Sequence, residues 1–144
     1  MPSETTISTP LPAGTTPQAV ISALHNHEVY IRTTCPQLIS YSHVSGAPEV
    51  GQPCEYEVTD KRPIGQTTYK LTLTNQSDGI DAVIDGKAPT GAMLIRSQWR
   101  VRGDSLEEAV EIDSNMLMNK MIKGNVEKSH PEQHQDFLAE AARA

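Results

Sequence analysis

The 144-residue sequence is poor in aromatic and basic residues and has no long apolar segment. Aromatic residues make up 4% of the chain, with one Trp and one Phe, so few rings are available to fill the centre of a domain. The 12 Lys and Arg residues are scattered and outnumbered by 18 Asp and Glu, which argues against nucleic-acid binding because phosphate backbones need clustered cations. No apolar run approaches the roughly 20 residues of a membrane-spanning helix.

Cysteine is also scarce. Cys35 and Cys54 allow one disulfide, but no spacing pattern marks a disulfide framework, so reduced thiols are expected. The first 14 residues, MPSETTISTPLPAG, lack the basic region and apolar core of a signal peptide, which favours a cytoplasmic protein. The length favours one domain over residues 1–144, large enough to form a core without disulfides or a structural metal.

The pattern of apolar residues predicts one antiparallel sheet and a long C-terminal helix. Residues 4–11 predict a first strand, and residues 15–36 predict one helix or two short helices broken near His27. Six later segments alternate with a period near two and are separated by short turns, which favours antiparallel pairing. They are residues 38–46, 54–60, 67–75, 79–87, 92–103 and 106–114, with turns that include 88–91. Residues 115–144 predict a helix that covers the apolar face of the sheet.

The alternation also predicts which side chains face the helix. Ile95, Ser97 and Trp99 share one face of their strand, and the same rule turns Tyr56 and Tyr69 inward. These side chains could simply form the core. However, Tyr and Ser hydroxyls and a Trp N–H need hydrogen-bond partners when they are buried, and a bound ligand or ordered water could supply them.

The start of the C-terminal helix is rich in methionine. Met116, Met118 and Met121 lie within one and a half turns, followed by Ile122. Methionine adapts to irregular apolar partners, so these residues could line a cavity, could attach the helix to the sheet, or could do both.

Two histidines, His130 and His134, lie four residues apart in the stretch EKSHPEQHQDFL. With Val126 at zero on a helical wheel, His130 lies roughly 40° away on the apolar stripe and His134 lies near 80°, at its margin. His130 is therefore expected to face the cavity as a proton donor or acceptor, and a surface position is the simpler interpretation of His134. Pro131 and a Ser129–Glu132 capping box predict that the helix breaks and restarts near residue 130.

A metal site is not expected at this histidine pair. Zinc would need a third ligand from elsewhere, the stretch HPEQH is not an H-E-x-x-H motif, and no Cys or Asp pair offers complementary spacing. Phosphate-binding glycine loops, nucleophile elbows and paired catalytic carboxylates are also absent from the sequence.

The order strand, helix, six strands, long helix resembles the helix-grip fold of the START and polyketide-cyclase-like (SRPBCC) superfamily over nearly the whole chain. The similarity is greatest to a fungal branch of that superfamily, on the stretches STPLPA, LHNHEVYIR, YEVTDKRPI, SQWRVRGD and KGNVEKSHPEQH. The resemblance implies an α+β fold in which a curved antiparallel sheet of about seven strands wraps around the C-terminal helix. Pro131 departs from the expected pattern, and no catalytic motif defines the branch, so no catalytic residue is carried over from it.

Two functions follow from this resemblance. The first is a cofactor-free cyclase or isomerase acting on a small hydrophobic intermediate of fungal secondary metabolism. The second is a non-catalytic carrier of a lipid, sterol or polyketide. The polar residues among the predicted inward-facing side chains favour the enzyme. No metal or cofactor is expected, and a homodimer is possible. The catalytic candidates are His130, Tyr56 and Tyr69; the predicted ligand-binding residues are Trp99, Ser97, Ile95, Met118, Met121, Ile122, His134 and His27.

Overall fold

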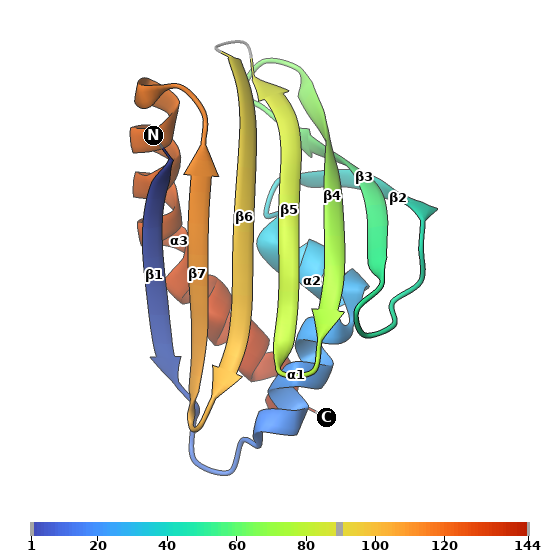
Figure 1. Cartoon of the computed structure of the whole chain (residues 1–144), viewed down its shortest axis with the longest axis vertical. Helices are drawn as coiled ribbons and strands as arrows, with labels where there is room; N and C mark the ends of the chain where they lie inside the picture. The colour runs from blue at the N-terminus through green and yellow to red at the C-terminus, as the bar shows by residue number, and fades with distance from the viewer. Residues whose placement is uncertain (1, 89–90, 144) are drawn as a thin grey trace.

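The computed structural model describes residues 2–88 and 91–143 as an α+β fold built on one antiparallel sheet. The strands are β1 (Ser3–Pro10), β2 (Leu38–Ser45), β3 (Pro53–Lys61), β4 (Gln66–Gln76), β5 (Gly79–Ala88), β6 (Gly91–Arg102) and β7 (Ser105–Asp113). The helices are α1 (Pro17–His25), α2 (His27–Thr34) and α3 (Met116–Ala142). All three helices lie behind the sheet in the view of Figure 1, so only one face of the sheet is covered.

The sheet has seven strands in the order β1-β7-β6-β5-β4-β3-β2. Consecutive strands from β2 to β7 form a meander, and β1 joins the far edge beside β7. This arrangement confirms the predicted antiparallel sheet. Two residues of the predicted turn at 88–91, Pro89 and Thr90, lie outside the described residues.

The first helical segment is two helices rather than one. Thr16 accepts a hydrogen bond from the backbone N–H of Ala19 (3.2 Å), and Pro17 occupies the first turn of α1. Asn26 then ends α1 and caps α2, because its side-chain oxygen accepts a hydrogen bond from the backbone N–H of Val29 (3.3 Å). The break therefore lies immediately before His27, as one of the two sequence alternatives predicted.

The predicted break at Pro131 is wrong, because α3 runs from Met116 to Ala142. The expected capping box does not form, and Ser129 Oγ instead donates to the backbone oxygen of Asn125 at 2.7 Å. Pro131 has no N–H for helix hydrogen bonding. Buried side chains on both sides of it, Val126 (5% exposed) and Phe137 (0%), attach the helix to the rest of the core. Tertiary packing thus outweighs the local cost of the proline.

The core lies between the inner face of the sheet and the helices. The buried inward-facing residues include Tyr56, Tyr69 and Trp99, as the alternation predicted. A smaller apolar cluster forms under the start of α3 from Val110, Ile112 and Val126. Among the described residues, no helix is both long enough and apolar enough to cross a membrane.

Candidate functional site

A buried carboxylate, Glu108, lies between the two histidines of α3. Glu108 points inward from β7 and is 0% exposed. His130 Nδ1 lies 2.9 Å from Glu108 Oε1 and 2.8 Å from Oε2, and His134 Nε2 lies 3.1 Å from Oε1. The one-turn spacing of the histidines brings both rings to the same strand residue.

His134 is fully buried, so the surface position expected for it is wrong. Its second ring nitrogen, Nδ1, lies 2.9 Å from Thr9 Oγ1 on β1. Both nitrogens therefore have partners, as a buried imidazole requires. The helical wheel misplaced this residue because α3 packs against β1 and β7 at the edge of the sheet, where Thr9 and Glu108 form a polar lining for that side of the helix.

The hydrogen bonds of Glu108 keep it ionised. Burial alone would raise its pKa, but the hydrogen bonds from His130 and His134 outweigh burial and hold the pKa of Glu108 below its ordinary value. An ionised carboxylate only accepts hydrogen bonds, so His130 donates from Nδ1 and His134 donates from Nε2. Glu108 thereby fixes the ring orientation of both histidines.

This arrangement leaves His130 Nε2 without a partner among the described residues. The side chain of His130 is 17% exposed and lies in the wall of a cavity of about 70 Å³ between α3, the end of α2 and the inner face of the sheet. Ile84, Ile95 and His130 are partly exposed, so solvent reaches the rim of this cavity. Its lining residues are Tyr30, Thr34, Cys35, Tyr69, Leu71, Ala82, Ile84, Ile95, Ser97, Val126 and His130.

Another lining residue, Tyr69, belongs to a second polar group. Tyr69 donates its hydroxyl proton to Asp60 Oδ2 at 3.1 Å, and Cys35 Sγ lies 3.2 Å from the same hydroxyl. Burial, followed by the neighbouring Cys35, raises the pKa of Tyr69 far above its ordinary value, so the phenol stays protonated. Its hydroxyl already donates a hydrogen bond to Asp60.

The other tyrosine candidate, Tyr56, does not line the cavity. His27 Nδ1 lies 2.9 Å from the Tyr56 hydroxyl and His27 Nε2 lies 2.8 Å from Asn75 Oδ1. The amide of Asn75 donates to the backbone oxygen of Pro48 at 3.1 Å. Since an amide oxygen accepts only, His27 donates from Nε2 and accepts from Tyr56 at Nδ1. These contacts connect α2, β3, β4 and the loop after β2, so they hold the fold together beside the cavity.

The structure places only some of the remaining predicted ligand-binding residues in the lining of the cavity. Ile95 and Ser97 line the cavity. Trp99 is buried behind it, with its ring 4.9 Å from the ring of His134 and 6.3 Å from that of His130. Met118 is buried, Ile122 packs on the smaller apolar cluster, and Met121 is 56% exposed and faces solvent.

Sequence reasoning missed Glu108, although a signal was present. Glu108 has the same parity along its strand as the apolar residues Val110 and Ile112, and that alternation turns all three inward. A carboxylate on an inward position is costly unless it is paired, so it predicts a buried partner.

Within the described part of the chain, no group of three or more His, Cys, Asp or Glu side chains is arranged to hold a metal ion.

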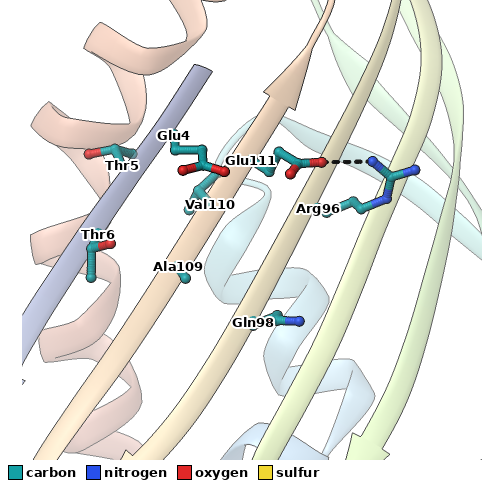
Figure 2. A pocket seen from close by; sticks show the side chains of 8 residues that line it. All are labelled: Glu4, Thr5, Thr6, Arg96, Gln98, Ala109, Val110 and Glu111. Atoms are coloured by element: carbon teal, nitrogen blue, oxygen red, sulfur yellow. Dashed lines mark hydrogen bonds and ion pairs between the residues drawn. The ribbon is translucent and has the colours of Figure 1, made fainter. Parts of the chain in front are cut away.

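A larger hollow of about 250 Å³ lies on the opposite, uncovered face of the sheet, over β1, β7 and β6. Figure 2 shows its side chains, including the ion pair in which Arg96 Nη1 lies 2.8 Å from Glu111 Oε1. Both side chains of this pair are substantially exposed, at 51% and 37%. This surface has neither the burial nor the aligned hydrogen bonds of the inner site, and we therefore place the candidate site around His130.

Solved structures with the same fold include two described as aromatase/cyclases. The di-domain ARO/CYC StfQ from the steffimycin biosynthetic pathway aligns with a TM-score of 0.72 at 8% identity, over 99% of this chain and 51% of that one. The Zhui aromatase/cyclase from Streptomyces sp. R1128 aligns with a TM-score of 0.60 at 13% identity, over 99% and 94%. A START superfamily protein from Mycobacterium smegmatis aligns with a TM-score of 0.62 at 11% identity, over 96% and 97%.

These alignments confirm the predicted helix-grip fold, and at such low identity they establish the fold alone. No curated protein matches the sequence. One family model does match, over residues 2–143, and it is described as a domain of unknown function, DUF7053. Because the match spans nearly the whole sequence, the chain belongs to the DUF7053 family.

Proposed function

We propose that the protein binds a small hydrophobic intermediate in the cavity beside His130 and promotes its cofactor-free cyclisation or isomerisation. The resemblance to a fungal branch of the SRPBCC superfamily supports a reaction in fungal secondary metabolism. In this proposal His130 is the general base, and Glu108 is the positioning residue that holds the ring and stabilises the imidazolium formed when His130 accepts a proton.

The observation that carries the proposal is the orientation of His130. The ring lines the cavity, its Nδ1 is held by a buried carboxylate, and its Nε2 has no hydrogen-bond partner among the described residues. A carboxylate, an imidazole and an open site in that order are the parts that proton transfer requires. A carrier needs an apolar cavity but has no use for a buried ionised carboxylate, which is costly to desolvate.

The cavity also constrains the substrate. Its volume of about 70 Å³ is well below the roughly 300 Å³ at which pockets for drug-sized ligands begin. We therefore propose that only the reacting unit enters the cavity and that any longer portion extends past the partly exposed Ile84 and Ile95. The aliphatic part of the lining limits the contact of the reacting atoms with water.

The test separates binding from turnover. Compounds are screened through the fluorescence of Trp99, the single tryptophan, and compounds that bind are incubated with the protein and analysed by mass spectrometry. His130→Gln is expected to keep affinity within a few-fold and to reduce turnover by about 10²–10⁴, the usual effect of losing a general base. His43→Gln is the matched control, because His43 is exposed, does not line the cavity and makes its hydrogen bonds to the backbone oxygens of Ser45 and Gly46.

Two outcomes would reject parts of this proposal. Full turnover in a stable His130→Gln variant would reject His130 as the base. Ligand binding without turnover in the wild type would favour the carrier.

We further propose a cytoplasmic location. Both Cys35 and Cys54 are buried free thiols, which is consistent with a reducing compartment.

A further inference from the structure

Tyr30 on α2 presents a hydroxyl proton that nothing in the described part of the chain accepts. The side chain is 4% exposed and lines the same cavity as His130. Its hydroxyl oxygen accepts a hydrogen bond from Trp99 Nε1 at 3.1 Å. That bond uses a lone pair of the oxygen and leaves the O–H free to donate.

The surroundings of Tyr30 keep this proton in place. Burial, followed by the negative charge of Glu108, raises the pKa of Tyr30 well above its ordinary value. The phenol is therefore neutral at working pH and acts as a donor. Because Trp99 donates to its oxygen, the O–H of Tyr30 is polarised and becomes a stronger donor.

Few other polar groups of the cavity are free. The hydroxyl proton of Tyr69 goes to Asp60, and the hydroxyl of Thr34 donates to the backbone oxygen of Tyr30 at 2.8 Å. Ser97 lines the cavity without a hydrogen-bond partner among the described residues. The cavity thus combines one free acceptor, His130 Nε2, with the free hydroxyls of Tyr30 and Ser97.

We propose that Tyr30 is a second catalytic residue and that the substrate is a small enolisable carbonyl compound. This inference rests on the proposed role of His130 as the general base. The carbonyl oxygen accepts the hydrogen bond of Tyr30, and the carbon next to the carbonyl faces His130 Nε2. Ketones and related carbonyl compounds meet both requirements, whereas a simple hydrocarbon chain meets neither.

The proposed reaction is balanced without a cofactor. The lone pair of His130 Nε2 takes a proton from the α-carbon, the C–H electrons form a carbon–carbon double bond, and the carbonyl π electrons move to the oxygen. Tyr30 stabilises that oxygen by hydrogen bonding, and the imidazolium is paired with Glu108. The imidazolium then returns the proton to a carbon, which gives isomerisation, or the enolate carbon attacks a second carbonyl, which closes a ring and leaves an alkoxide that takes the proton.

The enolisation step can be measured without the natural substrate. Acetone and cyclopentanone, two small enolisable ketones, are incubated with the protein in D₂O, and loss of their α-proton signals is followed by NMR. The imidazolium exchanges its proton with solvent, because His130 is 17% exposed, and returns deuterium to the carbon. The catalysed rate is the excess over the rate measured without protein.

The expected result is catalysed exchange in the wild type and a fall of about 10²–10³ in Tyr30→Phe, the usual effect of losing one oxyanion donor. Tyr41→Phe is the matched control, since Tyr41 lies on β2, makes a ring contact with Tyr56 and does not line the cavity. It is expected to keep the wild-type rate. Ser97→Ala measures the other free hydroxyl.

The outcomes separate this inference from the proposed function. Loss of exchange in His130→Gln together with a wild-type rate in Tyr30→Phe would reject Tyr30 and leave His130 as the base. A larger loss in Ser97→Ala than in Tyr30→Phe would transfer the donor role to Ser97. No catalysed exchange of either ketone in the wild type would overturn the carbonyl substrate class, and the turnover assay would still decide the proposed function.

Tyr30→Phe leaves the buried N–H of Trp99 without an acceptor and could unfold the protein. A second pair of variants removes this difficulty. Trp99→Phe keeps the hydroxyl of Tyr30 and serves as the baseline, and Tyr30→Phe added to it removes the hydroxyl without leaving an unpaired N–H. The same fall in exchange rate between these two variants supports the inference, and equal rates reject it.

Discussion

Replacing Glu108 with Gln tests the buried contact between β7 and α3. The substitution keeps the shape of the side chain but removes its charge and replaces one accepting oxygen with an NH₂ donor. In the wild type both oxygens accept from His130 at 2.8–2.9 Å, and His134 donates to one of them at 3.1 Å. In the variant one imidazole N–H must lose its acceptor or its ring must change tautomer.

The magnitude follows from those contacts. A buried donor left unpaired costs about 1–3 kcal/mol, and the remaining hydrogen bond loses its charge assistance. His134 can offset part of this cost by moving its proton to Nδ1 and donating to Thr9, which lies 2.9 Å away. We expect a loss of about 1–3 kcal/mol in the free energy of unfolding, which lowers the melting temperature by roughly 3–10 °C for a domain of this size.

The pH dependence of this loss identifies its cause. The pKa of Glu108 is depressed in the folded state, so below the ordinary carboxyl value of about 4.5 the unfolded chain binds a proton that the folded chain does not. The contribution of Glu108 is therefore complete above that pH and declines as the pH falls through the folded-state pKa. The difference in stability between wild type and Glu108→Gln should shrink over the same range.

Denaturant unfolding followed by circular dichroism between pH 3.5 and 7.5 measures both effects. Glu107→Gln is the control, because Glu107 lies on the outer face of the same strand in an exposed ion pair with Arg102 and should change stability by less than about 1 kcal/mol. Equal stability of wild type and Glu108→Gln at neutral pH, or a difference that stays constant into acid, would refute the reasoning.

Two further predictions concern the core beside the site. Burial lowers the pKa of His27, so as the pH falls below about 6.5 the unfolded chain binds a proton before the folded chain does, and the protein loses stability. The free energy of unfolding should therefore be lower at pH 5.5 than at pH 7.5 in the wild type, and this difference should be smaller in His27→Gln. An equal difference in both proteins would contradict it. Phe137 is fully buried with its ring 5.1 Å from Trp99, so Phe137→Ala should cost about 3–5 kcal/mol in thermal unfolding, and a loss below about 1 kcal/mol would show that this contact is weak.

The sequence predicted the sheet correctly because antiparallel strands with one covered face repeat every two residues. That period places Tyr69, Ser97 and Trp99 on the buried face, and the structure has them there. Short turns between the strands also determine their neighbours, so the meander from β2 to β7 follows from sequence spacing alone. The pairing of β1 with β7 depends on contacts between the two ends of the chain, and strand spacing and turn length do not predict it.

The region around Pro131 was predicted less well, because local rules there compete with tertiary contacts. A proline and a capping sequence favour a break, and each is worth only a few kcal/mol at most. The buried contacts of Val126, His134 and Phe137 lie on both sides of that position and together exceed this cost. The same contacts rotate His134 into the core, which no helical wheel centred on apolar residues can predict.

The cavity-facing groups show which features of a site the sequence predicts and which it does not. Alternation indicates that Tyr56, Tyr69 and Trp99 face inward, but it cannot indicate which hydroxyl protons are already donated. In the structure Tyr56 and Tyr69 are paired with protein groups, and among the described residues of the cavity the uncommitted hydroxyls belong to Tyr30 on a helix and Ser97 on a strand. The reaction that a buried site can promote depends on which hydrogen-bond donors and acceptors remain unpaired after folding. A buried site is therefore read from its hydrogen bonds, and for this protein they leave an acceptor on His130 and a donor on Tyr30 in the same cavity.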